Sequence, residues 1–257
     1  MNNIILAVGD SGSAVNFIRN LITLSDRVHW PHNELPRLDC IINCAYPDSL
    51  RNNLNNWMQC EYKLRNWEKA YDIDVSHEPN KSILTDKVHE SLTQGHVAFM
   101  VHWIRYAEHI VKEINTKVIT ISPATEFGLR WQIRSFVEKC GIDNVPNYTF
   151  TDNVEEQRCT MINLQGIDYY RRLNVLNMYE IIKNRIVDYQ DFGNTNGICV
   201  YLEELFSEQS FKLVVEKINN YFDIDIDIDT AMIVYKAWWQ LHWPVEHTKD
   251  FIWLNYE

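Results

Sequence analysis

The sequence lacks the cysteine patterns that indicate a disulfide-rich or zinc-binding protein. Its 257 residues include six cysteines, and none of them forms a CxxC pair. Cys40 and Cys44 lie close together, but no second pair completes a set of zinc ligands. Scattered cysteines in a chain of this length indicate reduced, mostly buried thiols of an intracellular protein. We therefore expect a cytoplasmic protein without a metal site.

Long hydrophobic runs and a secretory leader are also missing. The first apolar run, residues 4–8, is far too short for a signal peptide or a membrane span, and no basic residue precedes it. No internal repeat and no flexible linker interrupt the chain. The sequence therefore predicts one domain over residues 1–257, with no membrane span.

Positive charge is scarce relative to negative charge. The chain has 24 Lys and Arg residues against 35 Asp and Glu residues, which gives a net charge of −11. An acidic surface repels phosphate backbones, so we expect no nucleic-acid partner, although a local basic cluster could bind a small anion. The 46% of hydrophobic residues is ordinary for a globular protein, which excludes general disorder.

The beginning of the chain carries the clearest structural signal. Residues 4–8 form a continuous apolar run, as expected for a central parallel strand that is covered on both faces. A Gly-Asp-Ser-Gly-Ser turn follows at 9–13, and apolar residues then recur at helical spacing over 15–24. A strand, a glycine turn and a helix in this order open many α/β folds. We predict a three-layer, P-loop-like α/β domain with a mostly parallel central sheet flanked by helices.

Apolar runs and helical periodicities predict most of the other elements. Further strands are expected at 40–44, 117–121 and 197–202, and helices at 127–140, 169–189 and 210–222. The strands at 4–8, 117–121 and 197–202 should share one sheet, with 4–8 away from its edge. The pattern of 89–103 fits either a strand or a helix. Residues 223–229 alternate Asp and Ile, which fits a strand or a short excursion before a final helix.

The 9–13 turn has the chemistry of an anion site. Its glycines permit a tight turn, and the backbone amides at the start of the next helix point toward an anion. Ser11 and Ser13 could add hydroxyl donors. The Gly-Lys-Ser/Thr sequence of nucleotide-binding Walker loops is absent. The same pattern also fits a plain strand-to-helix turn with a capping serine.

Two other places carry candidate functional residues. His96, in a Gly-His pair near an expected strand, could act as a general base, although a structural histidine is the more common case. Ser122 ends an expected strand, and Arg130 and Arg134 lie on the helix that follows. These arginines could hold a phosphate through paired hydrogen bonds, or they could simply form a solvated helix face.

These pieces, in this order, resemble the sulfotransferase family over about four fifths of the chain. In that family the loop after the first strand holds the 5′-phosphosulfate of the donor, and several branches carry a Gly-His pair that is similar to Gly95 and His96. The residues that match the donor loop are Asp10, Ser11, Gly12, Ser13 and Ala14.

The later part of the resemblance concerns the 3′-phosphate of the donor. In the family a strand ends in Arg-x-Pro, with a serine six residues after the proline, and both the arginine and the serine contact this phosphate. The matching segment is Ile121-Ser122-Pro123, with Leu129 at the position of the serine. Residues 201–206 are similar to a Tyr-Glu-x-Leu segment that follows in the family.

The resemblance implies transfer of a sulfonate group from 3′-phosphoadenosine 5′-phosphosulfate to a hydroxyl or amine of an unknown small-molecule acceptor. His96 would take the acceptor proton, and the other site residues would bind the donor: Gly9, Asp10, Ser11, Gly12, Ser13, Ala14, Ser122, Arg130 and Arg134. Asp10 replaces a basic residue of the family loop, so a carboxylate would face the donor and limit its affinity. The alternative is a non-catalytic protein of P-loop fold that binds another ligand or a protein partner.

Overall fold

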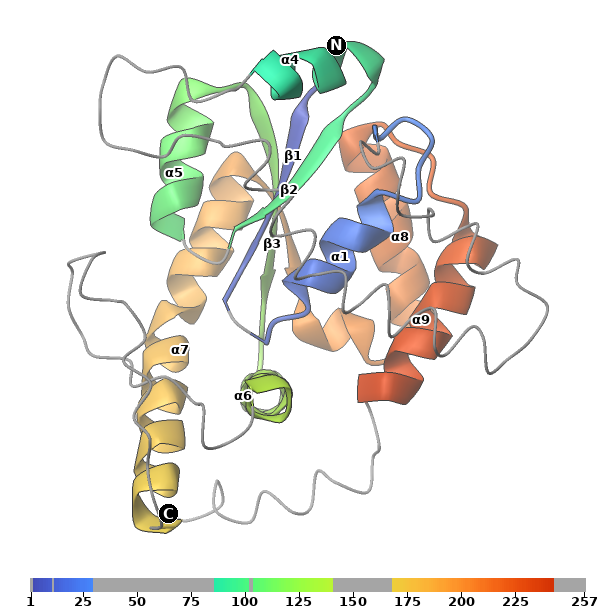
Figure 1. Ribbon diagram of the computed structural model, residues 1–257. Helices are drawn as coiled ribbons and strands as arrows, with labels where there is room; N and C mark the ends of the chain where they lie inside the picture. The colour runs from blue at the N-terminus through green and yellow to red at the C-terminus, as the bar shows by residue number, and fades with distance from the viewer. Residues whose placement is uncertain (1, 11, 30–85, 102–103, 141–167, 243–257) are drawn as a thin grey trace.

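The computed structural model describes residues 2–10, 12–29, 86–101, 104–140 and 168–242 (Figure 1). Its strands are β1 (Ile4–Gly9), β2 (Val97–Val101), β3 (Thr116–Ser122) and β4 (Gly197–Tyr201). They form one parallel sheet in the order β2-β1-β3-β4. The predicted α/β class, the parallel sheet and the internal position of the first strand are therefore confirmed.

The strand order creates a topological switch point at the carboxyl edge of the sheet. From β1 the chain crosses to β2 on one side and later enters β3 on the other side of β1. Gly9 lies beside Ile121 in the β1–β3 pairing, so both strands end at the same level. In open α/β sheets, ligands bind outside the carboxyl ends of the strands at such a switch point. The turn after β1 lies at this position.

Helices cover both faces of the sheet (Figure 1). One face packs against α1 (Val15–Ile22), α8 (Glu208–Phe222) and α9 (Ile228–His242). The other packs against α4 (Asp86–Gln94), α5 (Ile104–Glu113) and α7 (Asp168–Asn196). The helix α6 (Glu126–Cys140) follows β3 and lies beyond the carboxyl ends of the strands, and a 3-10 turn, η2 (Leu202–Leu205), follows β4.

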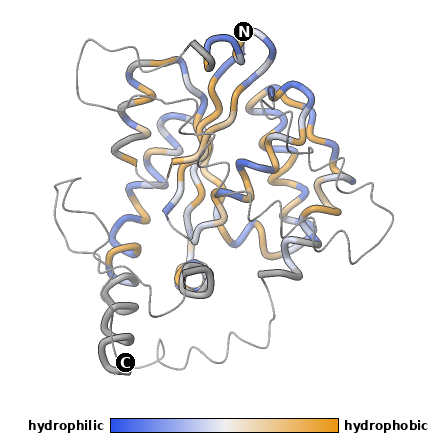
Figure 2. Tube along the Cα trace, viewed as in Figure 1, coloured by the Kyte–Doolittle hydropathy of each residue, from blue (hydrophilic) through white to orange (hydrophobic). Residues whose placement is uncertain are grey.

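The two faces of β1 belong to two separate hydrophobic cores. Ile5 and Ala7 join the core that contains Phe17 of α1 and Trp238 of α9, whose rings stack 4.3 Å apart. Alternate residues of a strand point to opposite faces, so Ile4, Leu6 and Val8 join the second core. Figure 2 shows the resulting band of hydrophobic residues along the central strands. This double burial explains the unbroken apolar run at the start of the sequence.

Most of the other predicted elements agree with the structure. The helices expected at 127–140, 169–189 and 210–222 are α6, α7 and α8, and the ambiguous segment 89–103 contains the end of α4 followed by β2. Residues 223–227 form no strand but connect α8 to α9, so the alternative of a short excursion is confirmed. The strand expected at 40–44 lies outside the described residues.

Within the described residues, no helix is long and apolar enough to cross a membrane.

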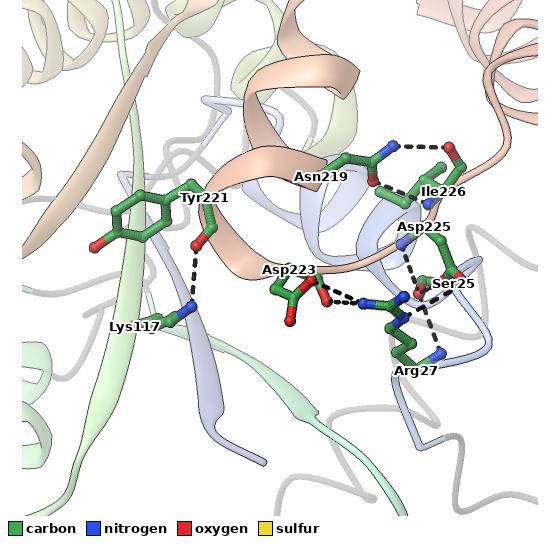
Figure 3. A network of polar contacts seen from close by, with 8 residues as sticks. All are labelled: Ser25, Arg27, Lys117, Asn219, Tyr221, Asp223, Asp225 and Ile226. Carbon is green, nitrogen blue, oxygen red and sulfur yellow. Dashed lines mark hydrogen bonds and ion pairs between the residues drawn. The ribbon is translucent and has the colours of Figure 1, made fainter. Parts of the chain in front are cut away.

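The connection from α8 to α9 is fastened at the amino-terminal edge of the sheet (Figure 3). The side-chain amide of Asn219 bonds both backbone groups of Ile226, each at 2.9 Å. The Ser25 hydroxyl, just after α1, bonds the carboxylate and accepts from the backbone amide of Asp225. Arg27 donates to the Asp223 carboxylate at 2.8 Å. These contacts hold the connection against the turn that follows α1.

We expect the Asn219→Ala substitution to lower the free energy of unfolding by about 2 kcal/mol, because it leaves two backbone groups of Ile226 without their partners. Asn220→Ala is the matched control, because Asn220 is an exposed residue of the same helix. It should change stability by less than about 0.5 kcal/mol. Urea unfolding measures both values, and equal stabilities of the two variants would contradict this role of Asn219.

Candidate functional site

The turn between β1 and α1 reverses the chain through two left-handed residues. Gly12 has φ 83° and Ala14 has φ 63°, and the Ser13 amide donates to the Asp10 carbonyl at 3.1 Å. Glycine adopts this conformation freely, whereas alanine does so at a cost in energy. Ser11 lies outside the described residues. The other predicted turn residues, Gly9, Asp10, Gly12, Ser13 and Ala14, lie together between β1 and α1.

The hydroxyl of Ser13 is the most unusual group of the turn. Ser13 is 1% exposed, and its Oγ has no hydrogen-bond partner within the part of the chain that the structure describes. The hydroxyl lies over Gly9, where an added Cβ would be 2.4 Å from Oγ. The N-cap residue of α1 is Ala14, which has no polar side chain to cap the helix. A buried donor and the amino terminus of a helix thus meet in one turn.

The carboxylate of Asp10 pairs with an arginine that the sequence analysis did not select. Asp10 is 8% exposed, and its Oδ2 lies 3.5 Å from Nη1 of Arg185 on α7. A carboxylate at this depth requires a partner, and the guanidinium offsets its charge. The expectation that this carboxylate faces a bound donor and limits its affinity stays a prediction, now with Arg185 beside it. Arg185 had no distinguishing sequence signal, because an isolated arginine on a long helix also fits a solvated face.

The amino terminus of α6, beside the end of β3, already holds a carboxylate. Glu203 of η2 accepts hydrogen bonds from the backbone amides of Ala124, at 2.9 Å, and Thr125, at 2.8 Å, and from the Thr125 hydroxyl. A Cβ on Gly128 would lie 2.1 Å from Glu203 Oε1, so the carboxylate occupies the space that a larger side chain would need. Negative charge is favourable at a helix amino terminus. Glu203 therefore takes the place of an external anion at α6.

The residues predicted to neutralise a phosphate near α6 have other surroundings. Ser122 is buried at the end of β3. The Nε of Arg130 donates to Glu126 at 2.7 Å, one turn earlier on α6, and the hydroxyl of Tyr179 donates to the same carboxylate at 2.6 Å. Burial and the hydrogen bond to Glu126 raise the pKa of Tyr179 to about 12, so this phenol stays protonated. Arg134 lies on α6, with its side chain outside the described part.

His96 lies at the opposite end of the sheet from the turn. It precedes β2, its Nδ1 accepts from the Asn3 amide at 3.0 Å, and its own amide donates to the Arg27 carbonyl. The six residues of β1 separate this edge from Gly9, a distance of about 20 Å. A small ligand at the turn therefore does not reach His96. The expectation that places His96 beside the donor is corrected, because the Gly-His pair comes before a parallel strand rather than after one.

No family model matches the chain, and no curated protein matches it. The geometry of the site therefore carries the functional argument. In the described part of the chain, no three His, Cys, Asp or Glu side chains are grouped so that they could hold a metal ion. The turn after β1 combines two glycines, a buried hydroxyl, an uncharged helix cap and a nearby guanidinium.

The Glu203→Ala substitution should lower the free energy of unfolding by about 1 to 2 kcal/mol, because the first amides of α6 lose their acceptor. Glu208→Ala is the control, since the Glu208 pair with Lys236 at 3.5 Å is exposed, a type of contact that contributes little. Thermal and urea unfolding compare the two variants. If both lose the same small amount, Glu203 does not cap α6.

His96 should make folding stability depend on acid pH. Burial lowers the pKa of His96 below its usual 6.5, so the folded protein binds a proton less readily than the unfolded chain. Stability that is present at neutral pH should therefore be lost as the pH falls below 6.5. His96→Asn, which keeps an acceptor for the Asn3 amide, should show a smaller loss between pH 7 and pH 5 in urea unfolding. An identical loss in both proteins would contradict this account.

Proposed function

We propose that this protein binds the terminal phosphate or sulfate group of a small molecule at the turn after β1, as a sulfotransferase-like protein does with its donor. The observation that carries the proposal is the buried Ser13 hydroxyl, which has no hydrogen-bond partner among the described residues, next to a helix amino terminus that Ala14 cannot cap. Both lie outside the carboxyl ends of β1 and β3, at the switch point of the sheet.

The energetic cost of the turn in the free protein supports ligand binding at this place. A buried hydroxyl that makes no hydrogen bond costs about 1 to 3 kcal/mol of stability. The left-handed Ala14 adds to this cost. An oxyanion over the start of α1 would accept hydrogen bonds from the Ser13 hydroxyl and from the helix amides, and it would interact favourably with the helix dipole. An anion would thus provide a hydrogen-bond acceptor for the buried Ser13 hydroxyl and for the first amides of α1.

Sulfonate transfer needs little covalent chemistry from a protein. The donor and the acceptor must be held in line, and the charge that spreads over the transferred group must be stabilised. In this proposal the donor is 3′-phosphoadenosine 5′-phosphosulfate, and the acceptor is a small molecule with a hydroxyl or an amine. The Gly9–Ser13 turn and α1 would hold the sulfonate and the adjoining phosphate.

A second candidate function is ligand binding without catalysis, and the position of Glu203 favours it. The resemblance to sulfotransferases implies that the end of β3 and the start of α6 bind the 3′-phosphate. Here the Glu203 carboxylate already accepts hydrogen bonds from the amides of Ala124 and Thr125. Ile121 and Leu129 are buried and apolar at the two positions where phosphate ligands would stand. A ligand that has a 5′-phosphate and no 3′-phosphate would avoid this repulsion.

The Ser13→Ala substitution should separate binding from stability. Removing an unsatisfied buried hydroxyl should leave the free energy of unfolding unchanged or higher, and it should weaken phosphate binding by about five- to tenfold, the value of one hydrogen bond. The matched control is Ser207→Ala. Ser207 caps α8 by accepting from the Ser210 amide, so this variant should lose about 1 kcal/mol of stability and keep full binding.

Calorimetric titrations of adenosine 3′,5′-bisphosphate and AMP measure these affinities and also distinguish the two functions. Tighter binding of the bisphosphate supports the sulfotransferase donor site. Equal or tighter binding of AMP supports the second candidate. If neither compound binds the unmodified protein at millimolar concentration, the proposed anion site is wrong.

A further inference from the structure

The anion site proposed above lacks positive charge of its own. Residues 9–14 contain a carboxylate, Asp10, and no lysine, arginine or histidine. A carboxylate beside an incoming phosphate repels it, and the repulsion is strongest where water is excluded. The amides of a helix amino terminus contribute only partial charge. A cation from another part of the chain is therefore needed if an anion is to bind tightly at this turn.

Arg185 is placed to supply this charge. It extends from α7, which packs on the opposite face of the sheet from α1, and it approaches the turn from the other side of β1. Its side chain is 35% exposed, and its Nη1 lies 3.5 Å from Asp10 Oδ2. This distance is at the long limit for a hydrogen bond. A guanidinium carries five N–H donors in a planar fork, so one long contact leaves most of them available.

The segment of α7 that carries Arg185 is held firmly against β3. Gln190 donates to the Pro123 carbonyl at 2.9 Å, at the carboxyl end of that strand. Gly193 lies so close to Thr120 that an added Cβ would be 1.9 Å from Thr120 Oγ1. Arg185 lies five residues before Gln190, or about 7.5 Å along the helix axis, which carries it past the end of the strand. The helix segment that carries Arg185 is therefore positioned by its packing against β3.

We infer that Arg185 is the cationic residue of this anion site. A terminal phosphate or sulfate group lying over the start of α1 accepts hydrogen bonds from the Arg185 guanidinium on one side and from the Ser13 hydroxyl on the other. Asp10 orients the guanidinium in the free protein and competes with the anion for it. This assignment rests on the proposed function and adds to it a residue from the other side of the sheet, whose charge replaces the missing basic residue of the turn.

Calorimetric titration with inorganic phosphate and with AMP tests the assignment. Arg185→Gln should weaken the binding of both by about tenfold or more, because a charge-assisted hydrogen bond is lost and the guanidinium no longer offsets the charge of Asp10. Asp10→Asn should strengthen binding several-fold, because it removes the competitor. Lys183→Gln is the control, since Lys183 lies on the same helix over the Tyr179 ring and should leave both affinities unchanged.

The Arg185→Gln variant removes the guanidinium that pairs with the buried Asp10 carboxylate, so it could unfold for that reason alone. The double variant Asp10→Asn with Arg185→Gln contains no unpaired charge, and its affinity should fall well below that of Asp10→Asn. If these two variants bind phosphate equally, the assignment of Arg185 is wrong, while Ser13→Ala still tests the turn itself. If the unmodified protein binds neither phosphate nor AMP, the anion site and this assignment both fall.

Discussion

The burial of β1 on both faces is the constraint on which the rest of the structure depends. Its backbone pairs with β2 on one side and β3 on the other, and its side chains enter two separate cores. The chain leaves this enclosed strand at the carboxyl edge of the sheet, in the turn after Gly9, and α1 then packs back on one face. The position of the candidate site therefore follows from the burial of the first strand.

Three helices show different solutions to the unsatisfied amides at a helix start. Ser207 caps α8 from within its own segment, and Glu203 reaches α6 from beyond the next strand. The N-cap residue of α1 is Ala14, which has no polar side chain, although the buried Ser13 hydroxyl lies beside it. Within the described residues, the first amides of α6 and α8 have side-chain acceptors, whereas the Ser13 hydroxyl beside α1 has no hydrogen-bond partner. An external anion would complete the α1 terminus as Glu203 completes that of α6.

The local sequence predicted the elements with a regular hydropathy pattern. The apolar runs of β1, β3 and β4 and the helical periodicity of α8 were sufficient, because a strand covered on both faces and a helix buried on one face each leave a recognisable pattern. The position predicted for His96 beside the donor does not fit the structure, because Gly95 and His96 directly precede β2 at its amino end, and the pattern of 89–103 did not distinguish a strand from a helix. Residues 223–227 alternate in hydropathy without forming a strand, since their aspartates bond to Arg27 and Ser25 instead of to a neighbouring strand.

By itself the sequence determined the strand, the glycine turn and the helix that follows it, because these depend on neighbouring residues and on backbone geometry. Only the tertiary structure decided which charges meet there. Asp10 and Arg185 are 175 positions apart, and Glu203 lies 79 positions from Ala124. A lone arginine or glutamate has the same local pattern whether it is solvated or paired. The order of the strands and the packing of α7 bring these residues together, and that order is a property of the whole fold rather than of any segment.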